Sequence, residues 1–135
     1  MSDVLIVDDC ADQLELMQLA IVSLGIRRRV FALTSGEEAI SAIERGAVQP
    51  ALVLLDVNMP GLDGPASLVR LRQLPATRRT PIVMLSTSDR VQDVQRCIDA
   101  GANSYVSKPT GPRSWSDILR MVIGYWCDTD VGRRG

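Results

Sequence analysis

Three short runs of the sequence are apolar at almost every position, and they constrain the fold more than any other feature. The runs are VLIV at residues 4–7, ALVLL at 51–55 and PIVML at 81–85. A strand with two apolar faces must be covered on both sides, as the central strands of a parallel sheet are. These runs therefore predict a sheet that is buried between two layers of helices.

Segments with apolar residues at helical spacing lie between the predicted strands. Strand–helix repeats of this kind form a parallel sheet with helices on both faces. The predicted strands are residues 4–8, 28–33, 51–57, 81–86 and 104–109, and the predicted helices are 11–25, 35–46, 63–74, 89–102 and 112–126. We expect one α/β domain over residues 1–127 and a flexible polar tail over 128–135.

The composition excludes several classes of protein. With 15 basic and 16 acidic residues, the chain has a formal net charge of -1, which gives no footprint for nucleic acid. No apolar run is long enough to span a membrane, and a first strand that begins at Val4 leaves no room for a signal peptide. Three scattered cysteines fit a reducing cytoplasm. The lack of histidine removes the commonest general base and a favoured zinc ligand.

Polar residues end four of the five predicted strands. In a parallel α/β sheet, ligands bind at the edge formed by the carboxyl ends of the strands. We expect five side chains to converge there, and these are Asp8, Asp9, Asp56, Ser86 and Lys108. The sequence therefore predicts a site at this edge.

Three carboxylates placed close together cannot all stay ionised without a cation. Oxygen ligands without sulfur or imidazole suit Mg²⁺, and Mn²⁺ can substitute. Because Mg²⁺ keeps few protein ligands, it favours an anionic substrate such as a phosphoryl group, which Lys108 would also attract. Asp56, at the centre, can act as a carboxylate nucleophile that yields an aspartyl phosphate.

Four motifs in order, VDD, LLDVNMPGLDG, PIVMLSTS and GANSYVSKP, resemble the receiver domain of two-component response regulators. The resemblance covers residues 4–126 and implies a flavodoxin-like, doubly wound sheet with strand order 2-1-3-4-5 in a single domain. It implies that Asp56 is the phosphoacceptor and Asp9 a direct Mg²⁺ ligand. Asp8 would act mainly through a bound water, and Asn58 would contribute its backbone carbonyl. The protein would then take part in a phosphorelay without being an enzyme beyond its own phosphotransfer and autodephosphorylation.

The resemblance also implies roles for residues after the fourth and fifth strands. Lys108 would pair with the phosphoryl group, and its bond to Pro109 would be cis. Ser86 would be the switch hydroxyl, Thr87 would contribute its backbone, and Tyr105 would be the switch aromatic that turns inward. The phosphoryl group would come from a phosphohistidine of a partner kinase. The SYVSKP segment and the IGYW helix end resemble stand-alone regulators paired with phytochrome-type sensor kinases.

Other interpretations compete with this one. Asp8 and Asp9 could be a helix cap and a first-turn acid. A haloacid-dehalogenase-type phosphohydrolase also uses an Asp nucleophile and Mg²⁺, but it needs a second acid at the position of Asn58 and a nucleophile on the first strand motif. A receiver-like module that takes no phosphate would usually lack one of the key acids or the lysine. The chain ends soon after the last predicted helix, so we expect its output to be a surface that binds a partner.

The last predicted helix carries an excess of aromatic residues. Trp115, Leu119, Val122 and Trp126 form a seam that is typical of an intramolecular core, while Trp115, Tyr125 and Trp126 together are also candidates for an interface. On the predicted helix over 89–102, Val91, Val94 and Ile98 share one face. We predict a symmetric homodimer through the face made by the fourth helix, fifth strand and last helix.

Overall fold

The computed structural model describes residues 2–88, 90–109 and 114–128. The elements, in order, are β1 (Asp3–Val7), α1 (Ala11–Ser23), β2 (Val30–Leu33), α2 (Gly36–Glu44), β3 (Pro50–Asp56), α3 (Gly64–Gln73), β4 (Ile82–Ser86), α4 (Val91–Asp99), β5 (Ser104–Ser107), α5 (Trp115–Ile123) and the π-helical turn η1 (Gly124–Asp128). The five parallel strands form one sheet in the order β2-β1-β3-β4-β5. The predicted flavodoxin-like fold is confirmed.

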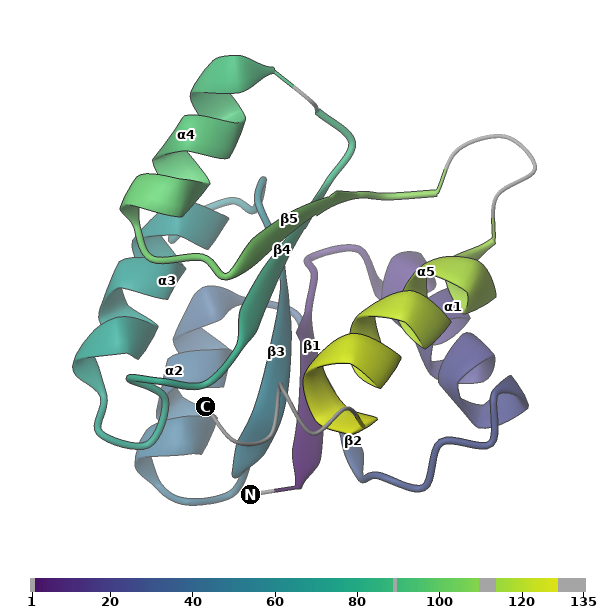
Figure 1. Cartoon of the computed structure of the whole chain (residues 1–135). Helices are drawn as coiled ribbons and strands as arrows, with labels where there is room; N and C mark the ends of the chain where they lie inside the picture. The colour runs from purple at the N-terminus through teal and green to yellow at the C-terminus, as the bar shows by residue number, and fades with distance from the viewer. Residues whose placement is uncertain (1, 89, 110–113, 129–135) are drawn as a thin grey trace.

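Helices cover both faces of this sheet, with α1 and α5 on one side and α2, α3 and α4 on the other (Figure 1). Side chains alternate along each strand. In β1, Val4 and Ile6 pack in the core shared with α1 and α5, whereas Leu5 and Val7 pack in the core shared with α2 and α3. The apolar runs of the sequence are therefore explained by two separate cores that meet at the sheet.

The start of α3 presses against the end of β3, where one of the predicted site residues lies. Asp63 caps α3 by accepting a hydrogen bond from the Ala66 N–H at 2.9 Å. The Gly64 N–H donates to the carbonyl of Val57 at 2.9 Å. A Cβ atom on Gly64 would clash with the backbone carbonyl of Asp56 and would lie 2.7 Å from the Cα of Val57. Only glycine permits this close approach, which fixes the backbone at Asp56.

The apolar face predicted for the fourth helix is turned largely to solvent. Val91 is 79% exposed and Ile98 is 54% exposed, and the only buried residue of α4 is Cys97. Packing therefore holds α4 less firmly than α3 and α5, each of which buries five residues.

The seam of the last helix belongs mostly to the core of the domain. Trp115 is 8% exposed, and Leu119 and Val122 are buried with it between α1 and the sheet. Proposing Trp115 as an interface residue was therefore wrong, because its indole fills the intramolecular core and its Nε1–H donates to Gln13 at 3.1 Å. Trp126 packs against this core from its edge, and Tyr125 is 51% exposed.

The end of the chain departs from the predicted boundaries. The predicted tail over 128–135 lies outside the described residues except for Asp128, which ends η1. The predicted start of the last helix, at residues 112 and 113, also lies outside them. Within the described part of the chain, no helix has the length and apolar character needed to cross a membrane.

Replacing Gly64 by alanine tests the close approach of α3 to β3. Because the new Cβ would meet backbone rather than a flexible side chain, we expect Gly64→Ala to lower the free energy of unfolding by about 1–3 kcal/mol. Gly124→Ala is the matched control, since a Cβ added there would have no neighbouring atom within 4 Å and the φ of Gly124 is -59°. Urea unfolding compares the two variants, and equal stabilities would contradict the claim that Gly64 is sterically required.

Candidate functional site

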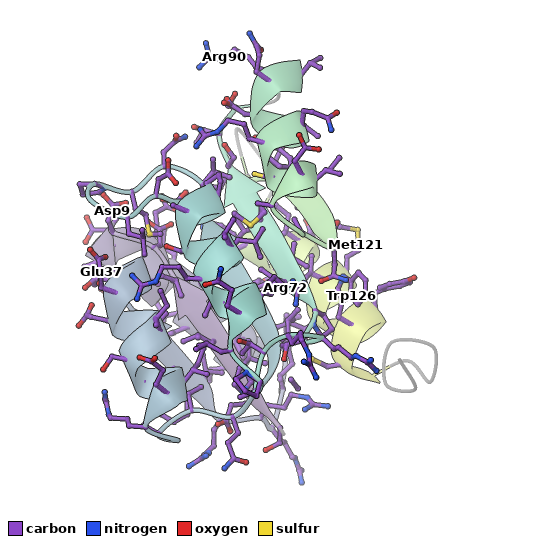
Figure 2. The ribbon with its side chains drawn as sticks, turned by 90° about the vertical axis from the view of Figure 1, so that its left-hand side faces the viewer. Asp9, Glu37, Arg72, Arg90, Met121 and Trp126 are labelled. Atoms are coloured by element: carbon purple, nitrogen blue, oxygen red, sulfur yellow. The ribbon has the colours of Figure 1, made fainter. Side chains whose placement is uncertain are left out.

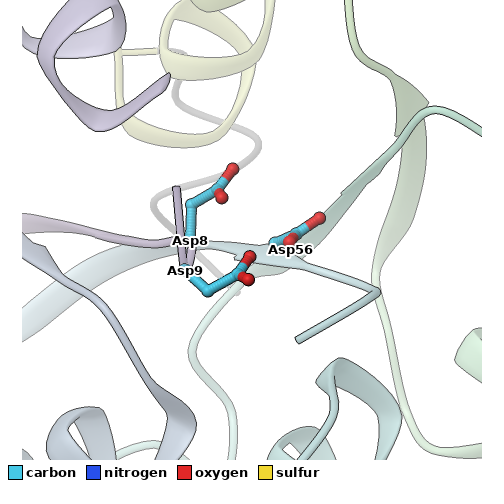
Figure 3. Close-up of side chains that lie close together, drawn as sticks. All are labelled: Asp8, Asp9 and Asp56. Atoms are coloured by element: carbon cyan, nitrogen blue, oxygen red, sulfur yellow. The ribbon is translucent and has the colours of Figure 1, made fainter. Parts of the chain in front are cut away.

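Three carboxylates meet at the carboxyl edge of the sheet. Asp8 and Asp9 follow β1, and Asp56 ends β3, the strand beside it. Figure 3 shows the three side chains gathered in one place, and one oxygen from each lies within 4.8 Å of the others. Asp8 and Asp56 are buried, whereas Asp9 is exposed at the mouth of the site. This confirms that the predicted acids converge. The N-cap residue of α1 is Cys10 and, among the described residues, no side chain caps this helix, so capping does not account for Asp8 and Asp9.

Lys108 supplies the positive charge of the cluster. The backbone N–H of Lys108 donates to the carbonyl of Ser86 at 2.8 Å, which holds the end of β5 beside the end of β4. Its ammonium nitrogen lies 2.7 Å from an oxygen of Asp8 and 3.1 Å from an oxygen of Asp56. The Lys108 side chain is only 11% exposed. The ammonium group therefore bridges two buried carboxylates from two different strands.

The charges shift the acid–base behaviour of the cluster. Burial, together with the repulsion from Asp8, raises the pKa of Asp56 from an ordinary 3.8 to about 6, although Lys108 opposes this rise. Burial lowers the pKa of Lys108, but its bonds to Asp8 and Asp56 outweigh that effect and leave the pKa raised. Asp56 is thus mostly ionised at neutral pH, while its charge is only partly compensated.

The other oxygen of Asp8 is also engaged. It accepts a hydrogen bond from the backbone N–H of Cys10 at 2.9 Å. With Lys108 on one oxygen and this N–H on the other, Asp8 has less capacity left for a cation than Asp9, whose exposed carboxylate has no such contact among the described residues. The arrangement fits a cation held directly by Asp9 and Asp56 and less directly by Asp8.

The predicted switch residues Ser86 and Tyr105 lie on the neighbouring strands β4 and β5, and both bond to a residue that the sequence did not single out. Ser86 is fully buried, and its hydroxyl oxygen accepts the Ser88 N–H at 3.0 Å. The Tyr105 hydroxyl donates to the carbonyl of Ser88 at 2.5 Å. The Ser88 hydroxyl donates to Asp93 of α4 at 2.7 Å. A serine in a strand-to-helix loop has no distinctive sequence signal, so Ser88 and Asp93 could not have been picked out in advance.

Two further predicted site residues lie at the surface of the protein. Asn58 and Thr87 are both exposed, each just beyond the carboxyl end of its strand.

The predicted cis bond before Pro109 is wrong, because no peptide bond among the described residues is cis. The trans form is the intrinsic preference of a peptide bond before proline. With this bond in the trans form, the Lys108 ammonium contacts both Asp8 and Asp56.

The cluster has the parts needed for chemistry on an anionic group. Hard oxygen ligands without sulfur or imidazole match Mg²⁺ and Mn²⁺. An ionised carboxylate at Asp56 is a nucleophile that needs no general base. The Lys108 ammonium, 3.1 Å from Asp56, can contact an anion that arrives there.

Comparison with known proteins agrees with this geometry. The family model for the response regulator receiver domain matches residues 4–120. The response regulator Rcp1 of Synechocystis sp. is 29% identical over 134 residues, which cover 93% of this chain and 89% of Rcp1.

Two solved structures of response regulators superpose closely on this chain. The Mn²⁺-bound form of response regulator Rcp1 superposes with a TM-score of 0.84 at 25% identity and covers 96% of both chains. The phosphorylated cyanobacterial phytochrome response regulator RcpA superposes with a TM-score of 0.84 at 27% identity and covers 93% of both chains.

Neutralising Asp56 should stabilise the metal-free protein in a pH-dependent way. Since the folded-state pKa of Asp56 is about 6 and its ordinary value is 3.8, this group's contribution to stability is fully present below about pH 3.8 and is lost as the pH rises through about 6. We expect Asp56→Asn to raise the free energy of unfolding by about 1–3 kcal/mol at about pH 7.5, and by much less at about pH 4.

Urea unfolding with a chelator present measures this difference at both pH values. Asp99→Asn, on the exposed side of α4, is the control and should have a small effect at either pH. An Asp56→Asn effect that does not change with pH would contradict the raised pKa of Asp56.

Proposed function

Because the chain belongs to the response regulator receiver family, we propose that Asp56 accepts a phosphoryl group from a phosphohistidine of a sensor histidine kinase. Receiver domains are phosphotransfer domains that work with such kinases. The observation that carries the proposal is the placement of the Asp56 carboxylate, 3.1 Å from the Lys108 ammonium and within 4.8 Å of two further carboxylates.

In the proposed transfer, a carboxylate oxygen of Asp56 forms a bond to phosphorus as the bond from phosphorus to the kinase histidine breaks. The electron pair of that bond returns to the imidazole nitrogen, and Asp56 becomes an acyl phosphate. The Lys108 ammonium, already at the carboxylate, attracts the phosphoryl oxygens as they arrive. Positioning and charge compensation supply most of the catalysis in such a step.

Asp9, Asp56 and the backbone carbonyl of Asn58 would hold a Mg²⁺ or Mn²⁺ ion, with Asp8 acting through a water. When bound, the cation neutralises charge on the carboxylates and on the phosphoryl group. The engagement of both Asp8 oxygens by Lys108 and by the Cys10 N–H supports the indirect role of Asp8.

The chain would catalyse only its own phosphorylation and dephosphorylation. A phosphohydrolase of the haloacid-dehalogenase type is disfavoured because its second acid is replaced by Asn58, which stands two residues after the nucleophile. Asp56 also ends β3 rather than the first strand. We expect the protein to work in the cytoplasm on a protein partner rather than on nucleic acid.

The partner kinase is proposed to be of the phytochrome type. RcpA is described as a phytochrome response regulator, and its likeness to this chain extends over 93% of both proteins. The proposal rests on that likeness and on the resemblance of the SYVSKP segment at residues 104–109.

The proposed output is a change in the face formed by α4, β5 and α5. After phosphorylation, the Ser86 hydroxyl would turn toward the phosphoryl group and Tyr105 would turn inward. Both residues contact Ser88 in the loop before α4, so a change at the site would reach this face through one short segment.

Phosphorylation in vitro tests the function. Incubated with Mg²⁺ and acetyl phosphate, the wild-type protein should gain one base-labile phosphate, and Asp56→Asn should gain none because an amide is a poor nucleophile. Intact-mass spectrometry measures the gain. Asp63→Asn is the matched control, because asparagine still caps α3, and it should be phosphorylated like the wild type. Omitting Mg²⁺ should abolish the gain, and undiminished labelling of Asp56→Asn would move the site elsewhere.

We also propose a homodimer through the α4–β5–α5 face. Apolar side chains are exposed on two of its elements and on η1, which continues α5, and these are Val91, Ile98, Met121 and Tyr125. A two-fold axis would let this patch pair with itself. Because Trp115 is buried, the aromatic contribution would come from Tyr125 and the Trp126 ring at 4.8 Å from it.

Light scattering at micromolar concentration, with and without phosphorylation, tests the dimer. Ile98→Glu should give a monomer, since it places a charge in the predicted interface. Leu19→Glu, at a 59% exposed position on α1, is the control and should leave the dimer intact. A wild-type protein that stays monomeric in both states would refute the dimer.

A further inference from the structure

Helix α4 is held to the rest of the domain by little apolar packing. Cys97 is its only buried residue, whereas α5 buries five, which are Trp115, Ile118, Leu119, Val122 and Ile123. The upper end of α4 also extends beyond the sheet (Figure 1), and Arg90 at that end projects into solvent (Figure 2). Polar contacts must therefore contribute much of what fixes the position of this helix.

In the described part of the chain, polar side-chain contacts connect α4 to the loops at the carboxyl edge of the sheet. One of them, from Arg90 to Asp93 at 3.6 Å, involves an arginine that is 75% exposed. Arg96 pairs with Asp63 at 3.1 Å, but these side chains are 56% and 36% exposed, and exposed ion pairs contribute little. Ser88 donates its hydroxyl to Asp93 at 2.7 Å, and the Asp93 side chain is 17% exposed. A short hydrogen bond to a shielded carboxylate is the strongest of these contacts.

Ser88 is bonded to both predicted switch residues as well as to α4. Its N–H donates to the Ser86 hydroxyl oxygen at 3.0 Å, and its carbonyl accepts the Tyr105 hydroxyl at 2.5 Å. Its own hydroxyl donates to Asp93 and accepts the Arg90 N–H at 3.2 Å. One residue thus connects the site hydroxyl, the switch aromatic and the first turn of α4.

A purely local role would be a substitute cap for α4. The cap residue Arg90 makes no side-chain capping bond, and the Ser88 hydroxyl accepts the Arg90 N–H in its place. That role accounts for the bond from Arg90 but not for the bonds of Ser88 to Ser86 and Tyr105. A cap would also affect only the stability of α4, which makes the two roles separable by experiment.

We propose that Ser88 is a positioning residue whose hydroxyl, through Asp93, transmits a change at the phosphorylation site to helix α4. This inference rests on the proposed function of Asp56. Since the Ser86 oxygen accepts a bond from Ser88, the Ser86 proton is available to a phosphoryl group on Asp56. A rotation of Ser86 breaks its bond to Ser88, the loop moves, and the bond from Ser88 to Asp93 moves α4 with it.

Two measurements report separately on the switch residue Tyr105 and on helix α4. The chain has two tyrosines, Tyr105 and Tyr125, so fluorotyrosine labelling gives two fluorine NMR signals that Tyr125→Phe assigns. Amide hydrogen exchange over residues 91–99 reports on α4. Both are recorded on the full chain before and after phosphorylation with Mg²⁺ and acetyl phosphate, and intact mass confirms the phosphate in each sample.

In the wild type, phosphorylation should shift the Tyr105 signal and change exchange in α4. In Ser88→Ala the shift of the Tyr105 signal should persist, because the Tyr105 hydroxyl donates to the backbone carbonyl of residue 88. The change of hydrogen exchange in α4 should be lost in this variant. Asp93→Ala should lose it too, and the double variant should lose no more than either alone. Ser88→Thr keeps a hydroxyl and should restore the change. Asp99→Ala removes an acid whose side chain accepts from Gln95 within α4, and it should behave as the wild type.

The outcomes distinguish this inference from the function on which it rests. A wild-type protein that takes no phosphate overturns both. A phosphorylated Ser88→Ala or Asp93→Ala protein whose α4 changes as much as the wild type overturns the role of Ser88 alone. Raised exchange in α4 before phosphorylation, with an unchanged response afterwards, identifies Ser88 as a cap only and likewise overturns the proposal.

Discussion

The buried ammonium group of Lys108 is the contact on which the rest of the site depends. It lies 2.7 Å from Asp8 and 3.1 Å from Asp56, in a place where all three side chains are at most 11% exposed. Two buried carboxylates without a counter-charge would cost several kcal/mol, so the carboxyl edge of the sheet could not hold them ionised. The contact also joins the end of β5 to the ends of β1 and β3, which are its third and second neighbours across the sheet.

Lys108 compensates only part of the negative charge of the carboxylates, and the uncompensated negative charge suits the proposed chemistry. Burial, together with the repulsion from the other carboxylates, leaves the pKa of Asp56 raised to about 6, because the single positive charge of Lys108 compensates only part of these effects. The excess of negative charge favours a divalent cation, and the cation together with Lys108 favours a phosphoryl group. The backbone of Asp56 is also fixed by α3, because Gly64 allows the start of this helix to pack directly against it. Charge and backbone geometry together leave one carboxylate reactive and fixed in place.

Much of this arrangement could be predicted from the sequence, because it follows from patterns along single segments. Continuous apolar runs indicated the buried parallel strands, and the polar residue at the end of each run indicated the site. The acids and Lys108 were placed correctly because the carboxyl ends of parallel strands must share an edge.

What could not be predicted from the sequence depends on contacts between segments. The apolar spacing of α4 predicted one apolar face, but whether that face meets the core depends on how the helix is set against the sheet, and Val91 is 79% exposed. Trp115 was ambiguous for the same reason, since a tryptophan suits a core and an interface equally well. The trans bond before Pro109 could not be told from a cis bond because the two differ little in free energy. Ser88 gains its partners only when β4, β5 and α4 come together.

The central claim is that Lys108 is the counter-charge that keeps Asp56 ionised near neutral pH in the metal-free protein. Carbon NMR of the aspartate carboxyl groups, titrated with acid and assigned by loss of one signal in Asp56→Asn, measures the pKa of Asp56 directly. The account predicts a pKa of about 6 in the wild type and a clearly higher pKa in Lys108→Met, which keeps the length of the side chain and removes its charge. A pKa of Asp56 that is unchanged or lower in Lys108→Met would contradict the account.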